Sequence, residues 1–271
     1  MGKIRASVLF VLYENFDEAE ITLRSLAEQQ CRDVELILSD DGSAGYDTSL
    51  LEKEAERLKG TFAEVRVNVN EKNMGSVAHF NRLFGIAKGE YIVFCSPGDR
   101  FPTPHTVERI VSRMERGKET VLTGRRRDMY ADHSKVRPSL LVGAALRICP
   151  RLLMNYMIRR RNLISSCCTA YSKRLFERCG MPDEGYRLLD DFPYIITLLQ
   201  KGERIGFTRE IFLEHSIGGG VSTGESIHPL ILKDLIRMQE QLAAHPEGLY
   251  ASTRRYLERE IAKRRTEDGR G

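Results

Sequence analysis

Along the first hundred residues, short apolar runs alternate with longer segments in which apolar residues recur every three or four positions. Four runs are typical of strands buried on both faces: 7–12, 34–38, 65–69 and 91–95. Three segments with a helical period separate them: 17–30, 49–59 and 77–88. This alternation predicts an α/β fold with a mainly parallel central sheet and helices on both faces.

The second half of the chain is less regular. We expect helices over 106–116, within 186–202 and over 229–243, the last with its apolar residues mostly on one side. Strands are expected over 120–124, 163–171 and 204–207. A glycine-rich loop follows at 218–224, and the final residues, TEDGRG, are expected to fray. Residues 226–271 therefore read as a C-terminal helical extension.

Composition narrows the class of protein. Hydrophobic residues make up 41% of the 271, and the net charge of +4 is too small to indicate nucleic-acid binding. The six cysteines lack CxxC spacing, so we expect them to be reduced, as in a cytosolic protein. No signal peptide is evident, and no apolar run approaches the roughly 20 residues that span a membrane. We expect a cytoplasmic protein, soluble or peripheral to a membrane.

Carboxylates follow two of the expected strands. Asp40 and Asp41 come after the second strand and Asp99 after the fourth, and in parallel sheets ligands bind at these ends. The phosphate-binding patterns GxGxxG and GxxxxGK[ST] are missing, as is the GxSxG elbow of hydrolases. Carboxylates that face a diphosphate need a divalent metal between them, so the pattern indicates a nucleotide held with a metal.

Several motifs, in order, resemble family 2 glycosyltransferases of GT-A fold, the group that builds bacterial surface polysaccharides. The resemblance runs from about Ser7 to about Thr223. The matching segments are VELILSDDGSAGYD, NMGSVAHFNRLFGIAKGEYIVF, CSPGD in the place of the metal motif, CGMPDEGYRLLDDFPYIITLLQKGERIGF and the later GGGVST. The resemblance implies inverting transfer of a sugar from a nucleotide diphosphosugar, with UDP as the expected nucleotide, to an acceptor hydroxyl.

The family's acid pair aligns on Asp190 and Asp191. Inverting transfer needs a base for the acceptor's hydroxyl proton, and the resemblance assigns that role to Asp191. The alternative is that both acids merely cap the helix that follows them and suit its dipole.

The resemblance makes Asp99 the ligand of a divalent metal, Mn²⁺ or Mg²⁺, that bridges the diphosphate. The sequence departs from the family here, because Ser96, Pro97 and Gly98 stand where many members have further acids. One carboxylate with diphosphate oxygens and waters can still hold such an ion. His215 lies where some GT-A enzymes bring a histidine to the metal. A turn role for Asp99 and a structural role for His215 remain open.

The nucleotide site implied by the resemblance comprises Tyr13, Glu14, Asp41, Asn73 and Gly75. Asp41 would contact the nucleoside, and Asp40 would brace the loop. Two departures stand out. Glu14 occupies the place of a usual Asn, and Phe80 that of an Arg near the diphosphate. Lys72 or Arg82 would compensate for that Arg, and a solvated surface role for each is the alternative. An Asx-type turn at DDGS is compatible with either role.

On this basis we divide the chain into a nucleotide-sugar half, residues 1–100, an acceptor half, 101–225, and the extension, 226–271. Residues 140–161, LLVGAALRICPRLLMNYMIRRR, mix apolar and basic side chains as interfacial segments do. They would dock on the cytoplasmic leaflet, where a lipid-linked acceptor is found. The alternative is a core helix with a solvated basic edge.

Two other functions fit a sheet of this kind. A sugar nucleotidyltransferase would need a glycine-rich, basic loop after the first strand, and LYENFDEAE has none. A degenerate transferase that only senses nucleotide or binds a protein is favoured solely by the reduced metal motif. The donor sugar and the acceptor, a glycan or a lipid-linked molecule, are not encoded in any motif we can identify.

Overall fold

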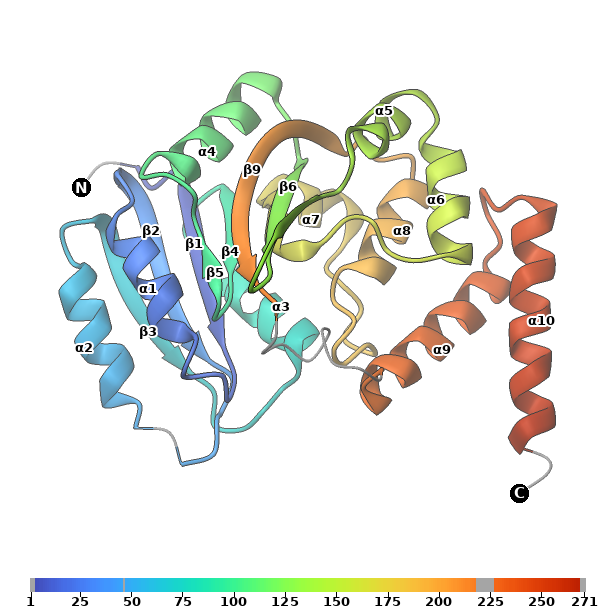
Figure 1. The fold of residues 1–271 in the computed structure, drawn as a ribbon, viewed down its shortest axis with the longest axis horizontal. Coiled ribbons are helices and arrows are strands. Elements are labelled where there is room, and N and C mark those ends of the chain that lie inside the picture. The colour runs from blue at the N-terminus through green and yellow to red at the C-terminus, as the bar shows by residue number, and fades with distance from the viewer. Residues whose placement is uncertain (1–2, 46, 218–226, 269–271) are drawn as a thin grey trace.

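The computed structural model describes residues 3–45, 47–217 and 227–268. In this part of the chain one nine-stranded sheet has the order β3-β2-β1-β4-β8-β6-β9-β5, with β7 paired to β6 (Figure 1). The parallel half consists of β1 (Ala6–Leu12), β2 (Cys31–Asp40), β3 (Phe62–Val69) and β4 (Tyr91–Cys95). The expected α/β fold and parallel sheet are confirmed, with strand ends shifted by a few residues.

Helices cover both faces of this half, because side chains alternate across each strand. Val8 and Phe10 of β1 pack with α1 (Ala19–Ala27), α2 (Ser49–Leu58) and α4 (Thr106–Gly117). Leu9, between them, packs on the other face with α3 (Ser76–Ile86). Two apolar clusters therefore sandwich the sheet.

The second half of the sheet contains antiparallel pairs. It consists of β5 (Asp99–Arg100), β6 (Val121–Met129), β7 (Ser134–Arg137), β8 (Thr169–Ser172) and β9 (Gly206–Ser216). β8 runs antiparallel to β4. β9 pairs with β5 so that His215 lies opposite Asp99.

Three expectations in this half need correction. The strand expected over 163–171 is wrong: a 3₁₀ turn, Ser166–Cys168, precedes a strand of only four residues, β8. Local hydrogen bonds turn the chain there, since Asn162 Oδ1 accepts from the amide of Ile164. The strands expected at 120–124 and 204–207 are longer, because the residues that follow them also pair in β6 and β9.

Six further helices lie in the second half: α5 (Leu140–Ile148), α6 (Pro150–Arg159), α7 (Lys173–Cys179), α8 (Phe192–Gln200), α9 (Pro229–Ala244) and α10 (Ala251–Asp268). The helical extension is confirmed as α9 and α10, at the end of the molecule away from α2 (Figure 1). The expected fraying is wrong for 266–268, which continue α10. Residues 269–271 and the glycine-rich loop at 218–224 lie outside the described residues.

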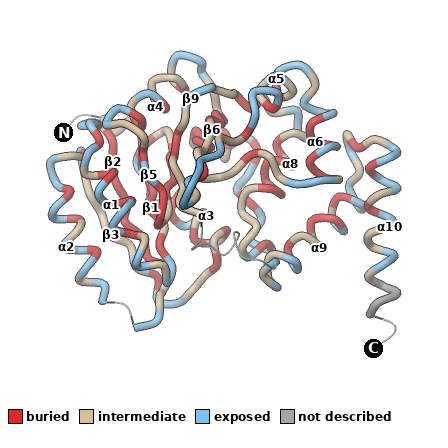
Figure 2. Tube along the Cα trace, viewed as in Figure 1, coloured by how far each residue is buried: buried red, intermediate tan, exposed pale blue. Residues whose placement is uncertain are grey.

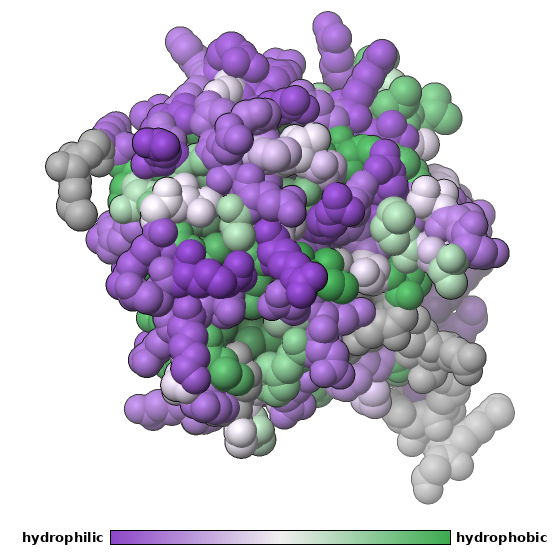
Figure 3. All heavy atoms as spheres, turned by 60° about the vertical axis from the view of Figure 1, so that its left-hand side comes forward, coloured by the Kyte–Doolittle hydropathy of each residue, from purple (hydrophilic) through white to green (hydrophobic). Residues whose placement is uncertain are grey.

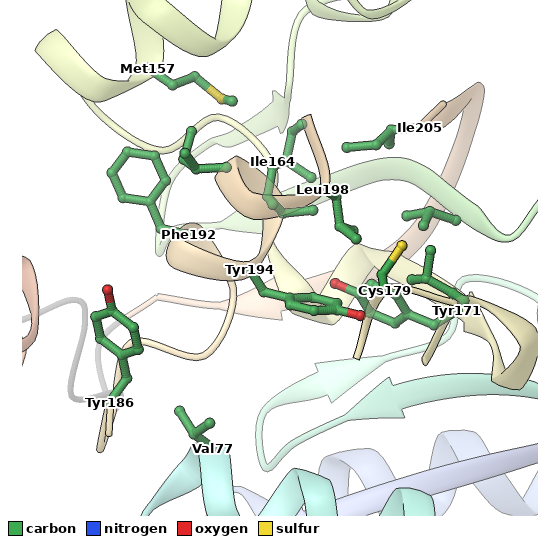
Figure 4. Packing of buried hydrophobic residues seen from close by; sticks show 14 of the residues in the cluster. Val77, Met157, Ile164, Tyr171, Cys179, Tyr186, Phe192, Tyr194, Leu198 and Ile205 are labelled. Carbon is green, nitrogen blue, oxygen red and sulfur yellow. The ribbon is translucent and has the colours of Figure 1, made fainter. Parts of the chain in front are cut away.

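Burial is concentrated in the strands and the inner faces of the helices (Figure 2). Close to α8, Met157, Ile164 and Phe192 belong to the larger apolar cluster (Figure 4). Hydrophilic side chains form most of the face shown in Figure 3, with small apolar patches between them. Among the helices of the described ranges, none combines the length and the apolar character needed to cross a bilayer.

Candidate active site at the carboxyl ends of the strands

Asp41 joins the loops that follow β2 and β3. Its carboxylate accepts hydrogen bonds from Asn70 Nδ2 at 2.8 Å and from the amides of Met74 and Gly75, each at 3.0 Å. Gly75 has φ of 85°, and a Cβ there would lie 2.7 Å from the carbonyl oxygen of Arg187. The side chain of Asp41 is buried, so it fixes the backbone on which a nucleoside would rest.

The other residues expected to bind nucleotide gather around the same edge. Asp40 braces the loop as expected, since it accepts from the amide and hydroxyl of Ser43 at 2.9 and 2.5 Å. The Ser43 hydroxyl in turn accepts from the amide of Glu14. The side chain of Tyr13 is exposed and interacts with those of Glu14 and Asn73. The structure thus brings together the first strand end and the Asn73–Gly75 loop.

Phe80, which takes the place of the family's arginine, and Arg82, which would compensate for it, have different surroundings. Phe80 is part of an aromatic cluster, with its ring centroid 4.7 Å from that of Phe94. Arg82 donates to Asn68 at 3.4 Å. Whether Lys72 or Arg82 reaches a diphosphate stays a prediction.

The buried Asp99 and the partly buried His215 form a pair because β5 and β9 place them opposite each other. Asp99 Oδ1 lies 2.7 Å from His215 Nδ1, and Oδ2 accepts from the amide of Ser96 at 2.8 Å. Burial works against protonation of the imidazole, but the hydrogen bond and charge of Asp99 outweigh it and raise the pKa of His215. Asp99 therefore closes the Ser-Pro-Gly turn and orients a histidine at once.

This pair fits one side of a divalent-metal site. Within the described ranges, no group of three His, Cys, Asp or Glu side chains could hold a metal, so diphosphate oxygens and waters would supply the remaining ligands. A carboxylate oxygen with an imidazole nitrogen suits Mn²⁺ better than Mg²⁺, which prefers oxygen throughout.

Asp190 and Asp191 precede α8 and are partly buried. Asp191 stands at the N-cap, yet it makes no capping hydrogen bond. Instead its Oδ2 accepts from the amide of Ser166 at 3.2 Å. Burial raises the pKa of Asp191. The pKa of Asp190 is raised to about 8, mainly by burial and secondly by the charge of Asp191. This is the environment of a proton acceptor working near neutral pH, and it disfavours a capping role.

Cys167 lies in the 3₁₀ turn Ser166–Cys168, whose Ser166 amide donates to Asp191, and sequence reasoning missed it. The hydrogen bond with Cys168 lowers the pKa of the Cys167 thiol to about 7. Its Sγ lies 3.6 Å from Arg126 Nη1. Arg126 also donates to Asp128, which lies opposite His215 in the β6–β9 pair, and it lines a hollow together with Asp191. Arg126 therefore places positive charge near both the acid pair and the Asp99–His215 pair.

Two more residues that sequence reasoning missed hold this edge together. Arg187 donates to Asn73 Oδ1 at 2.8 Å and so ties the acid-pair loop to the nucleotide loop. Asp234 on α9 accepts from the amides of residues 187, 188 and 189 at 2.9, 2.7 and 2.9 Å. A carboxylate on the apolar side of an amphipathic helix was the available signal for Asp234.

A family model described as glycosyl transferase family 2 matches residues 7–180. The chain is 28% identical over 159 residues to an undecaprenyl-phosphate 4-deoxy-4-formamido-L-arabinose transferase of Pseudomonas fluorescens, covering 57% of this chain and 41% of that protein. It is 29% identical over 97 residues to a cholesterol galactosyltransferase of Borreliella burgdorferi, covering 36% and 26%. The chain thus spans less than half the length of these curated relatives.

Solved structures show the same fold. TarS 1-349 of S. aureus in complex with UDP-GlcNAc aligns with TM-score 0.68 and 16% identity over 95% of this chain and 71% of that one. A mannosyltransferase of Pyrobaculum calidifontis in complex with GDP-Man and Mn²⁺ aligns with TM-score 0.63 and 15% identity over 95% and 69%. The fold is thus GT-A. Since the family model matches more than half of its length, the chain belongs to glycosyl transferase family 2.

Proposed function

We propose that this protein is an inverting glycosyltransferase that moves a sugar from a nucleotide diphosphosugar, with UDP as the nucleotide, to an acceptor hydroxyl. The observation that carries the proposal is the hollow that Asp191 and Arg126 line together, since Arg126 lies on β6, the strand that pairs with the His215-bearing end of β9. A proton acceptor and a positive charge thus lie near the residues proposed to hold a cation, as displacement at an anomeric carbon requires.

Asp191 is the proposed base. The acceptor oxygen bonds to the anomeric carbon from the face opposite the diphosphate, and its proton passes to Asp191. The bond from the anomeric carbon to the diphosphate oxygen breaks, and its electron pair leaves with the nucleoside diphosphate. Asp191 then releases the proton to solvent, and the new glycosidic bond has inverted configuration.

The departing diphosphate needs positive charge. Asp99 and His215 would hold Mn²⁺ or Mg²⁺, which when bound neutralises charge on the diphosphate. Arg126 supplies a second, permanent charge, because its guanidinium lies beside Cys167 and acts on His215. Tyr13, Glu14, Asn73 and the loop held by Asp41 would position the nucleoside.

The names of similar proteins support a lipid acceptor, and surface-polysaccharide assembly is the setting that we propose for the transfer. One relative acts on undecaprenyl phosphate and another on cholesterol. UDP and UDP-GlcNAc are bound in TarS structures, whereas GDP-Man is bound in the mannosyltransferase. Which nucleotide the donor carries, UDP or GDP, is therefore an outcome of the thermal-unfolding test.

We also propose that α5 and α6 contact the cytoplasmic leaflet. Leu141 and Ile148 are each 78% exposed, although both are large apolar residues. Arg147 on α5 and Arg160 directly after α6 are exposed as well. Apolar side chains flanked by arginines suit a bilayer with anionic headgroups. The alternative of a core helix accounts only for the inner faces, where Val142 and other residues are buried.

The direct test is thermal unfolding with UDP, GDP, CMP and dTDP, each with and without Mn²⁺. A ligand that binds only the native state raises the melting temperature. We expect UDP with Mn²⁺ to raise it for wild type and Asp191→Asn, and to lose most of its effect for Asp99→Ala. A shift with another nucleotide would correct the donor. No shift with any of them would favour a module that binds neither donor nor metal.

A further inference from the structure

A hollow of about 610 Å³ lies beside the proposed base. It is lined by Asp191, by the β6–β7 hairpin and by the segment that follows α6. Four of its lining side chains are cationic, namely Arg126, Lys135, Arg137 and Arg161, and Asp191 is the acid among them. Such a surplus of positive charge is unusual for a pocket that takes a neutral sugar.

The strand register explains why the charges converge. In the antiparallel pair β6–β7, Arg126 lies opposite Arg137, and Asp128 lies opposite Lys135. Directly opposite residues, and residues two apart on one strand, share a face of the sheet. Three cations and one acid therefore occupy one face of the hairpin.

The one acid of that face is already engaged. Asp128 is buried, with Oδ1 accepting from Arg126 Nε at 2.6 Å and Oδ2 paired with Arg137 Nε at 2.8 Å. It holds both guanidinium groups in place and balances one of the two charges. In the part of the chain that the structure describes, Lys135 and Arg161 have no ion-pair partner, so their two charges add to the one that Asp128 leaves unbalanced.

Apolar residues form another part of the lining, among them Val142 and Tyr156 from α5 and α6. These are the helices that also expose Leu141 and Ile148. The hollow therefore offers an apolar wall, a cationic wall and the proposed base within one space.

We propose that this hollow is the acceptor subsite and that the acceptor carries a phosphate group, bound by Lys135 and Arg161 with the hydroxyl to be glycosylated toward Asp191. The inference rests on the proposed function, which makes Asp191 the base. A phosphate on a lipid and a phosphate on a water-soluble glycan share the chemistry that the cationic wall recognises.

The test measures binding of geranyl phosphate, geraniol and glycerol 3-phosphate by calorimetry. The variants are the double substitution Lys135→Gln with Arg161→Gln, and Lys53→Gln on α2 as the matched control for loss of an exposed cation. We expect wild type to bind geranyl phosphate, and the double variant to bind it about tenfold more weakly or worse. Lys53→Gln should bind it as wild type does.

Comparing the ligands distinguishes a phosphate on a lipid from a phosphate on a soluble glycan. Geranyl phosphate binding more tightly than glycerol 3-phosphate supports a lipid-borne phosphate, and equal binding supports a phosphate on a soluble glycan. The proposal is overturned if wild type binds neither phosphate, if geraniol binds as well as its phosphate, or if the double variant binds like wild type. The thermal shift with UDP, measured on the same samples, reports separately on the proposed function.

Discussion

The acid pair before α8 is where single side chains decide the chemistry. Asp190 and Asp191 adjoin in sequence, and burial raises the pKa of each. Neighbouring carboxylates lose their protons in two steps that belong to the pair. The sequence motif placed the base at Asp191, but only the structure shows that the environment keeps protons bound well above the usual range of an aspartate.

We predict that kcat/KM rises with pH as the Asp190–Asp191 pair loses its protons, so that the pKa values of the pair set the position of this ascending limb. Replacing Asp190 with Asn removes the neighbouring charge, so the limb should move to lower pH while turnover persists. Asp191→Asn should lose roughly 10²-fold or more of turnover at every pH, because the base is gone. Rate profiles of the three proteins measure this. The reverse result, with Asp190→Asn inactive and Asp191→Asn active, would make Asp190 the base.

Stability provides the control for this pair. A carboxyl group whose pKa is raised on folding binds protons more tightly in the native state, so stability declines as pH rises from about 4 toward the raised pKa. Asp190→Asn removes that penalty. Its melting temperature should therefore exceed that of wild type by more at pH 8 than at pH 5, which also shows that the variant folds.

Among elements, the parallel half could be predicted from the sequence and the antiparallel half only in part. Runs such as 34–38 are apolar because both faces of β2 are covered, which gives an unambiguous pattern. β5 has two residues, and the outer part of β6 is polar, so no apolar run marks either of them. The resemblance suggested both Asp99 and His215 as site residues. Their contact was not predictable, because it depends on the pairing of β5 with β9.

The exposed apolar side chains of α5 and α6 make a prediction about membranes. Wild type should co-sediment with liposomes that contain anionic lipid and less with neutral ones. Leu141→Ser combined with Ile148→Ser should weaken sedimentation, because burial of each apolar side chain contributes about 1.5–3 kcal/mol. Leu232→Ser on α9, an exposed leucine elsewhere, is the matched control. Sedimentation that is indifferent to lipid charge and to these substitutions would rule out the contact.

Across the whole molecule, contacts from α9 reach the nucleotide loop. Asp234 holds the amides of residues 187–189, and Arg187 holds Asn73, next to the loop that Asp41 fixes. No local pattern in the sequence encodes this chain of contacts, because its members are far apart along the chain. The division at residues 100 and 225 remains a prediction, although the larger apolar cluster includes residues from all three segments.

This chain of contacts predicts a remote effect on turnover. Asp234→Ala leaves three partly buried amides without their acceptor, so we expect a loss of about 1–3 kcal/mol of stability and lower turnover through displacement of the acid pair. Glu240→Ala, an exposed acid on the same helix, should change neither. Melting temperature and kcat measure the two effects. Unchanged kcat in a destabilised Asp234→Ala protein would confine Asp234 to a purely structural role.

The support that α9 gives to the acid-pair loop also decides where the chain can be truncated without loss of activity. The match to the family model ends at residue 180, before Asp190 and well before Asp234. A fragment with that boundary would still match the family model, but it would contain neither the proposed base nor the helix that anchors its loop. The smallest recognisable unit of this enzyme is therefore shorter than its smallest working unit.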